Sequence, residues 1–143
     1  WKYRVLYEGI CCWPYFAKLS VSFAGYGINM VGAIYTNAYG IEYSTFDEML
    51  KSYTYVPNAV SLERARDMRI GEIRKKKCDG MLVHMSRSCK IWSGIMYEMI
   101  RQIEDKEQIP IITFDGDQAD KQCFSEAQYD TRLQGFYELM ESK

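Results

Sequence analysis

The sequence predicts an α/β domain in which a four-stranded parallel sheet carries helices on both faces. Four short apolar runs alternate with longer segments of helical periodicity, and these runs occupy residues 4–7, 28–35, 80–85 and 109–114. Runs that are apolar at successive positions suit strands that are buried on both faces. The 143 residues contain no linker, repeat or low-complexity stretch, so we expect one domain over residues 1–143.

The helical segments between these runs carry their own start signals. Pro14 suits the first turn of a helix, and apolar residues at 16, 19 and 23 follow at helical spacing. Thr45 and Glu48 match a capping box, in which a hydroxyl and a carboxylate each accept a free backbone N–H. Ser61 precedes a charged helix that ends in the lysine cluster at residues 75–77, where positive charge is favourable.

Two further helices complete the pattern. Ser93 precedes an apolar stripe at residues 95, 96, 99, 100 and 103, and Ser125 with Gln128 matches a second capping box. The resulting order, β-α-β-α-α-β-α-β-α, predicts a doubly wound, flavodoxin-like sheet with right-handed crossovers.

Charge and composition exclude several classes of protein. The chain has 18 Lys and Arg against 19 Asp and Glu, a net charge of -1, so it lacks the basic surface of a nucleic-acid binder. No apolar run approaches the ~20 residues that span a bilayer, and no signal segment opens the chain, so we expect a cytoplasmic protein. The first residue is Trp rather than Met, from which we expect a piece of a longer polypeptide.

The five cysteines favour reduced thiols. They stand at positions 11, 12, 78, 89 and 123, an odd number with no Cys-x-x-Cys pair. A disulfide framework prefers an even number, and a complete zinc or iron–sulfur site usually shows closely spaced ligand pairs. We therefore expect most of them to be buried as small apolar side chains.

Candidate chemistry lies at the carboxyl ends of the predicted strands, where ligands bind in open parallel sheets. Cys89 follows the third strand and precedes a helix, with Arg87 and Lys90 beside it. Both the helix start and the flanking cations stabilise a thiolate, which binds metals or attacks electrophiles. An ordinary connecting loop with a bystander cysteine is the simpler interpretation of these residues.

Three other polar residues fall at the same edge, with two interpretations each. Asp115 and Asp117 could bind Mg²⁺, or they could form a turn at Gly116 and cap the next element. His84, the only histidine, could be a hydrogen-bonded structural residue or a base. The tyrosine-rich interval 39–55 suits a partner surface as well as a ligand wall.

Seven segments of the chain carry a family resemblance: residues 7–10, 13–15, 56–58, 84–90, 97–103, 114–120 and 131–135. They resemble the 2-hydroxyacyl-CoA dehydratases, and the Arg-Ser-Cys-Lys sequence at residues 87–90 resembles the α-type subunit. The resemblance implies a hydro-lyase that removes water from (R)-2-hydroxyacyl-CoA to give 2-enoyl-CoA through a ketyl radical, in anaerobic bacteria that ferment amino acids. It also implies a second dehydratase subunit and an ATP-dependent iron–sulfur activator as partners.

The resemblance further implies that Cys89 is a ligand of a [4Fe–4S] cluster. Its other ligands would lie upstream of this chain, which would then be the C-terminal domain of the subunit and inactive alone. Ser86, Arg87, Ser88 and Lys90 occupy the matching loop and are expected to line the acyl-CoA or cluster pocket. Which hydroxyacyl group is used does not follow from the sequence.

Two alternatives come from other classes of function. The first is a non-catalytic, flavodoxin-like binding or assembly module whose tyrosine-rich surface docks a partner, since fold does not imply function. The second is a thiol enzyme in which Cys89 is the nucleophile and His84 the base.

Overall fold

A computed structural model describes all residues from 1 to 143 and contains the predicted parallel sheet. The four strands are β1 (Tyr3–Glu8), β2 (Ile28–Ala33), β3 (Gly80–Ser86) and β4 (Ile111–Gly116). They are all parallel, in the order β2-β1-β3-β4. The chain therefore winds to one side of β1 and then to the other, as in flavodoxin-like sheets, and the predicted fold class is confirmed.

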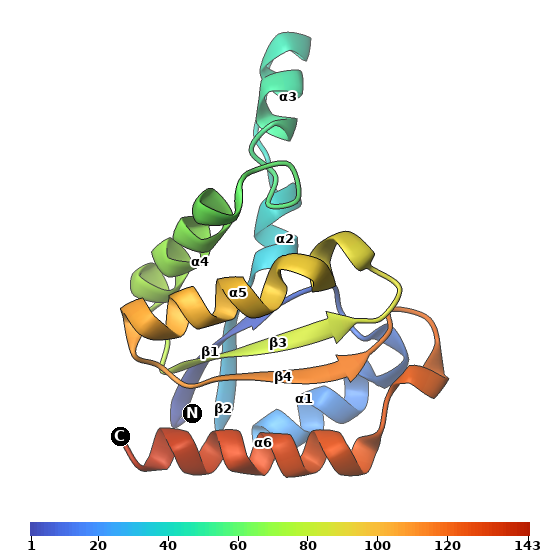
Figure 1. The fold of residues 1–143 in the computed structure, drawn as a ribbon, viewed down its shortest axis with the longest axis vertical. Helices are drawn as coiled ribbons and strands as arrows, with labels where there is room; N and C mark the ends of the chain where they lie inside the picture. The colour runs from blue at the N-terminus through green and yellow to red at the C-terminus, as the bar shows by residue number, and fades with distance from the viewer.

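Helices cover both faces of the sheet (Figure 1). On one face lie α4 (Leu62–Lys76) and α5 (Lys90–Glu107), and on the other lie α1 (Phe16–Gly25) and α6 (Glu126–Glu141). The remaining helical elements are η1 (Trp13–Tyr15), α2 (Ile34–Tyr39), α3 (Phe46–Tyr53) and η2 (Lys121–Cys123). No helix is long and apolar enough to cross a membrane.

Alternate residues of the strands supply two separate cores. On β3, Met81 and Val83 pack with α4 and α5, whereas Leu82 packs with α1 and α6. Because successive side chains of a strand point to opposite faces, a strand buried on both faces is apolar at most of its positions. This explains why the strands coincide with apolar runs of the sequence.

Three predicted boundaries were wrong by a few residues. The run 28–35 is not all strand: β2 ends at Ala33, opposite Tyr7 near the end of β1, and α2 follows immediately. This additional helix is absent from the predicted order. β4 is shifted to residues 111–116, so Gly116 ends the strand instead of forming a turn.

The third boundary concerns α5, which begins at Lys90 and not after Ser93. Cys89 is its N-cap residue, and the Ser93 hydroxyl donates a hydrogen bond to the Cys89 carbonyl inside the first turn. The apolar stripe of α5 is buried as expected, at Met96, Met99 and Ile103.

Of the two predicted capping boxes, one is complete in the structure and the other has one of its two hydrogen bonds. At α3 the Thr45 hydroxyl accepts the Glu48 N–H and the Glu48 carboxylate accepts the Thr45 N–H, which is a complete capping box. At α6 the Ser125 hydroxyl accepts the Gln128 N–H at 3.5 Å, without a return bond.

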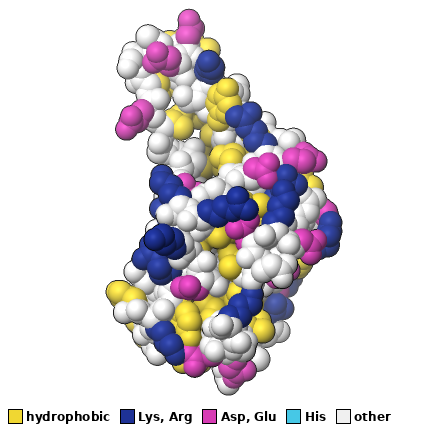
Figure 2. Space-filling view, turned by 90° about the vertical axis from the view of Figure 1, so that its left-hand side faces the viewer, with side chains coloured by type: hydrophobic (Ala, Val, Ile, Leu, Met, Phe, Trp, Pro, Cys, Tyr) yellow, Lys and Arg dark blue, Asp and Glu magenta, His cyan; other side chains and the backbone are white.

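Residues 40–60, which we term the arm, project from the sheet and carry α3 at their tip, clear of the rest of the chain (Figures 1 and 2). No residue of α3 is buried, although its apolar and polar residues segregate on the helix surface. The exposed apolar side chains of the arm are Tyr43, Phe46, Leu50, Tyr53 and Tyr55.

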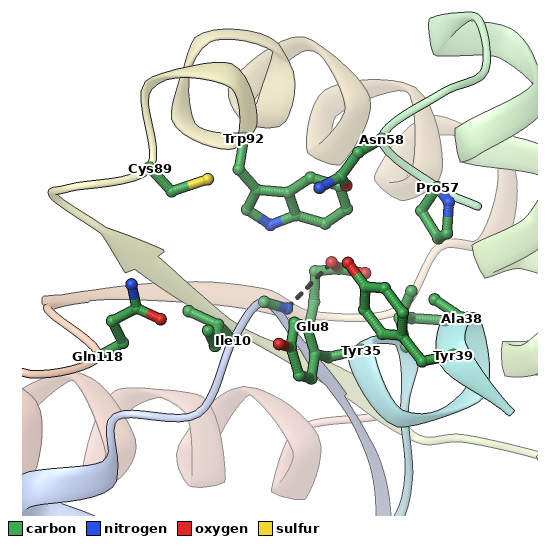
Figure 3. Close-up of a pocket in the computed structure, with 12 residues that line it drawn as sticks. Glu8, Ile10, Tyr35, Ala38, Tyr39, Pro57, Asn58, Cys89, Trp92 and Gln118 are labelled. Carbon is green, nitrogen blue, oxygen red and sulfur yellow. Dashed lines mark hydrogen bonds between the residues drawn. The ribbon is translucent and has the colours of Figure 1, made fainter. Parts of the chain in front are cut away.

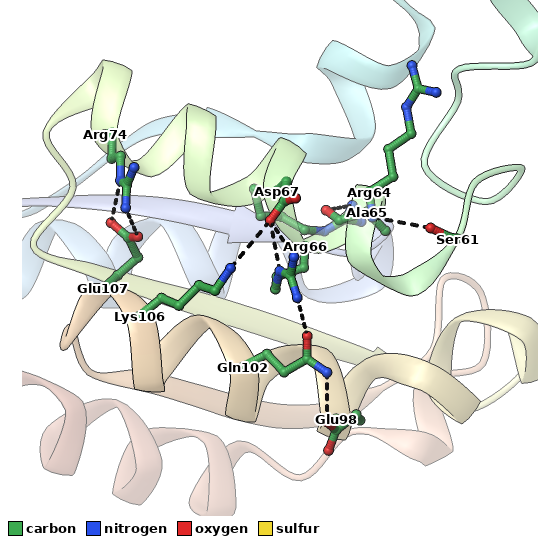
Figure 4. A network of polar contacts seen from close by, with 11 residues as sticks. Ser61, Arg64, Ala65, Arg66, Asp67, Arg74, Glu98, Gln102, Lys106 and Glu107 are labelled. Carbon is green, nitrogen blue, oxygen red and sulfur yellow. Dashed lines mark hydrogen bonds and ion pairs between the residues drawn. The ribbon is translucent and has the colours of Figure 1, made fainter.

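Polar contacts join α4 to α5 above their shared core (Figure 4). Arg74 forms a two-point ion pair with Glu107, with nitrogen–oxygen distances of 2.8 and 3.1 Å. Arg66 donates to the Gln102 side chain at 2.7 Å. These contacts fix the two helices that support the site described next.

Candidate functional site

A cavity of about 220 Å³ lies beyond the carboxyl ends of β1 and β3 (Figure 3). This is the point at which the strand order reverses, the usual ligand position in such sheets. Its lining comes from four parts of the chain: the end of β1, α2, the end of the arm, and the start of α5, with Gln118 at one side. The twelve lining residues are Glu8, Gly9, Ile10, Ile34, Tyr35, Ala38, Tyr39, Pro57, Asn58, Cys89, Trp92 and Gln118.

Cys89 lies at the edge of this cavity, and its sulfur points inward (Figure 3). The thiol is half-buried, and the residue caps an 18-residue helix. Its backbone N–H donates to the Ser86 carbonyl at 3.1 Å, which holds the loop in a tight turn. The residue therefore lies at the positive end of the helix dipole.

Asp117 braces the loop that carries Cys89. Its carboxylate accepts the backbone N–H of Ser88 at 3.0 Å and those of Ala119 and Asp120 at 3.0 and 3.2 Å. The hydrogen bond from Ser88 and the backbone bonds hold the pKa of Asp117 well below its usual range. Of the two interpretations of this aspartate, the structure shows the capping one, since all these bonds are to backbone N–H groups.

A buried ion pair closes the base of the cavity. Arg69 of α4 donates to both oxygens of Glu8, from Nε at 2.8 Å and from Nη2 at 3.2 Å, and both side chains are fully buried. The third guanidinium nitrogen, Nη1, donates to the Ala65 carbonyl at 2.8 Å. Burial raises the pKa of the Glu8 carboxyl, and the Arg69 charge opposes that shift.

Aromatic rings form the walls. Trp92 of α5 lies on one side of the cavity, with the Arg69 guanidinium 4.7 Å from its ring centre. Tyr35 and Tyr39 of α2 lie on the other side, with ring centres 5.0 Å apart (Figure 3). The Trp92 indole N–H is buried and has no hydrogen-bond partner.

His84 belongs to the opposite face of the sheet. Its ring stacks on Phe114 with centres 4.9 Å apart, and Nδ1 lies 2.6 Å from the Ile10 carbonyl, to which it must donate. Burial lowers the pKa of this imidazole. Cys89 packs instead against the core of α4 and α5, so the sheet separates the two residues, and the geometry does not support a Cys89–His84 nucleophile and base.

The other cysteines lie away from the cavity, and no three His, Cys, Asp or Glu side chains form a metal site. Cys12 is buried on the His84 side of the sheet, and burial raises its thiol pKa. Cys78 lies at the amino-terminal end of β3, where burial raises its pKa to about 11. Cys11 lines a separate apolar cavity, and the Cys123 sulfur donates to Asp120 at 3.5 Å.

The four loop residues that were expected to line a pocket are adjacent to Cys89 but do not reach the cavity. Ser86 is buried, whereas Arg87, Ser88 and Lys90 are exposed, and none of the four lines the cavity of this chain. Arg87 lies 3.9 Å from Asp115, which therefore has a cationic partner. A role of Ser86, Arg87, Ser88 and Lys90 in binding acyl-CoA or a cluster stays a prediction.

Sequence reasoning about individual residues missed Glu8, Arg69 and Trp92. A charged residue directly after the apolar residues Val5, Leu6 and Tyr7 is a signal that could have singled out Glu8. Arg69 looked like one of many charges on a solvated helix, and Trp92 lies before the apolar stripe from which α5 was recognised. Their connection depends on contacts between residues 61 positions apart.

Comparison with known proteins assigns the family. The family described as "2-hydroxyglutaryl-CoA dehydratase, D-component" matches residues 1–140. The chain belongs to this dehydratase family.

Three dehydratase subunits are similar in sequence to 99% of this chain. It is 45% identical over 142 residues to the (R)-phenyllactyl-CoA dehydratase alpha subunit of Clostridium sporogenes and 46% identical over 141 residues to the (R)-2-hydroxyglutaryl-CoA dehydratase subunit alpha of Acidaminococcus fermentans. It is 42% identical over 144 residues to the (R)-2-hydroxyisocaproyl-CoA dehydratase alpha subunit of Clostridioides difficile. The matches cover 35%, 30% and 35% of these proteins, so the chain spans about a third of their length.

Proposed function

We propose that this chain is the C-terminal domain of a 2-hydroxyacyl-CoA dehydratase α-type subunit and supplies Cys89 as one ligand of a [4Fe–4S] cluster. The complete enzyme would remove water from an (R)-2-hydroxyacyl-CoA by a radical (ketyl) route, together with a second subunit and an ATP-dependent iron–sulfur activator. The family and the subunit type of the relatives support the dehydratase class.

One observation supports the ligand assignment: the Cys89 sulfur points into the cavity from a helix N-terminus. Cysteine sulfur is the usual protein ligand of iron–sulfur clusters. A whole cluster does not fit this chain, because no second cysteine lines the same cavity. When bound, the cluster would supply one-electron chemistry.

The residues of the chain would do the remaining work at the site. Cys89 would hold the iron, Asp117 would keep the Cys89 loop in position through the Ser88 N–H, and the aromatic walls would exclude water from the reacting group.

Anaerobic iron–sulfur reconstitution of the full-length subunit tests the proposal. We expect Cys89→Ala to lower bound iron and sulfide and to alter the electron paramagnetic resonance of the reduced cluster. Cys123→Ala is the matched control, since that thiol is also half-buried but lies outside the cavity. Full cluster occupancy in Cys89→Ala would contradict the ligand assignment.

A second candidate function, a non-catalytic binding or assembly module, draws on the exposed aromatic side chains of the arm. Solvent-exposed tyrosine and phenylalanine are typical of partner surfaces. A full-length enzyme with Tyr43, Phe46 and Tyr53 replaced by Ser separates the functions. Loss of the partner subunit with an intact cluster would assign docking to the arm, and normal assembly would argue against it.

A further inference from the structure

The cavity beside Cys89 combines an unpartnered donor with a lack of free positive charge. Trp92 is 7% exposed, its indole N–H has no acceptor, and in Figure 3 the nitrogen lies on the ring edge that faces Glu8 and Ile10. A buried donor without an acceptor is costly, since buried polar groups almost always have a partner in the protein, in ordered water or in a bound group. The cavity therefore lacks a hydrogen-bond acceptor that a ligand oxygen can supply.

The charges around the cavity define which ligands fit. Glu8 is the only charged residue of its lining, and the nearby cation, Arg69, is fully engaged by Glu8 and by the Ala65 carbonyl. A second carboxylate in this space would be desolvated next to Glu8 without a cation to pair with. The other polar groups of the lining, at Tyr35, Tyr39, Asn58 and Gln118, are neutral.

Size and shape agree with one part of a ligand. The volume of about 220 Å³ is below the ~300–1,000 Å³ of pockets that hold whole drug-sized molecules, so it suits an acyl group and not an entire coenzyme A ester. Trp92 on one side and Tyr35 with Tyr39 on the other present aromatic surfaces to an apolar side chain (Figure 3).

We propose that this cavity selects 2-hydroxyacyl groups with an uncharged, apolar or aromatic side chain, and that the Trp92 N–H donates a hydrogen bond to an oxygen of the acyl group. The inference rests on the proposed function and narrows its substrate class. Trp92 is then a specificity-determining residue, and dicarboxylic acyl groups are disfavoured.

Equilibrium binding to the full-length enzyme, with both subunits but without the activator, tests this in the absence of turnover. We would titrate (R)-phenyllactyl-CoA and (R)-2-hydroxyglutaryl-CoA by calorimetry. The phenyllactyl ester is expected to bind at least tenfold more tightly. Trp92→Phe, which keeps an aromatic ring and removes the donor, should weaken its binding about three- to tenfold. Trp13→Phe, at an exposed tryptophan outside the cavity, should leave it unchanged.

A second variant covers the case in which Trp92→Phe does not fold. Tyr39→Arg places a cation at a half-exposed position of the lining and should shift the affinity ratio toward the hydroxyglutaryl ester by about tenfold or more. Tyr97→Arg is its control, because Tyr97 is also exposed, at 65%, and lies outside both the arm and the lining of the cavity.

The outcomes separate the inference from the function on which it rests. Equal affinities, tighter hydroxyglutaryl binding, or unchanged binding in a folded Trp92→Phe variant would overturn the inference and leave the dehydratase proposal standing. Failure of both esters to bind an enzyme that holds its cluster would overturn the proposed function as well.

Discussion

Glu8 and Arg69 are an unusual pair to find beneath a strand end, because both are fully buried. Neither could be tolerated there alone, since an unpaired charge in the interior is strongly unfavourable. Together they satisfy one another and leave no cation free for a ligand. The pair thus contributes both to the packing of α4 on β1 and to the chemical character of the cavity.

Removal of one partner should be more harmful than removal of both. We expect Arg69→Met to lower the free energy of unfolding by about 3–5 kcal/mol, because the Glu8 carboxylate is left buried without its cation. Urea denaturation of the chain measures this. The double variant Glu8→Leu with Arg69→Met should be more stable than Arg69→Met alone, and equal stability of the two would contradict the explanation.

His84 offers a test of burial through pH. Burial lowers the pKa of this imidazole, so the unfolded chain binds a proton below about pH 6.5 while the folded chain resists it. Stability contributed by the neutral ring is therefore present above that pH and is lost as the pH falls below it. The loss is at most about 1.4 kcal/mol per pH unit for a single proton.

The measurement compares urea denaturation of the wild-type chain and of His84→Gln between pH 7.5 and 5. Carboxyl groups titrate mainly below this range. We expect the difference in unfolding free energy between the two proteins to shrink as the pH falls. A constant difference would show that His84 is protonated as readily in the folded as in the unfolded chain.

Among the α-helices, α3 is the one that buries no residue against the rest of the chain. Its capping box and the segregation of its apolar residues could be recognised locally, and the structure has both. What the local pattern does not show is that the apolar side points to solvent, because that depends on what packs against it.

Substitution in α3 should consequently have little effect on the stability of the chain. We expect Phe46→Ser, at a side chain that is 68% exposed, to change the unfolding free energy by less than about 0.5 kcal/mol. Phe136→Ala in α6 is the comparison, at a fully buried ring, with an expected loss of about 3–5 kcal/mol. Similar losses in both variants would mean that α3 is part of the folded core.

The starts of α2 and α5, which line the cavity, were not predicted correctly, and the structure shows why. Residues 30–35 contain no polar side chain except the tyrosine hydroxyl, and the strand nevertheless ends at Ala33 because its partner β1 ends at Glu8. The backbone N–H groups of Ser88 and Cys89 are held by Asp117 and by the Ser86 carbonyl, and α5 starts directly after them. Both causes lie in neighbouring strands and loops and not in the segment concerned.

Taken as one folded unit, the chain has an apolar core on each face of its sheet, but it offers only one candidate ligand for the proposed cluster. Two apolar clusters fill both faces of the sheet, yet one cysteine alone lines the cavity. The chain spans about a third of its relatives' length, so the remainder of such an enzyme would have to supply the other ligands.

Reconstitution of the 143-residue chain should therefore fail where the full-length subunit succeeds. A single thiolate is too few for a stable [4Fe–4S] cluster, which is held by several cysteines. We expect iron that is bound to the isolated chain to be removed by gel filtration. A full cluster retained on this chain would contradict the proposed division of ligands.

The alternation of apolar runs and helical segments was enough to predict the sheet, its two covered faces and the position of Cys89 between the third strand and a helix, because these features depend on periodicity and on neighbouring residues. The ion pair of Glu8 with Arg69, the unpartnered Trp92 N–H and the separation of His84 from Cys89 were not predictable in this way. They arise from contacts between residues distant in the chain, and these form only when the strand order places β1, α4 and α5 side by side. Hence the family and the candidate ligand could be recognised from sequence, whereas the character of the cavity became visible in the folded chain.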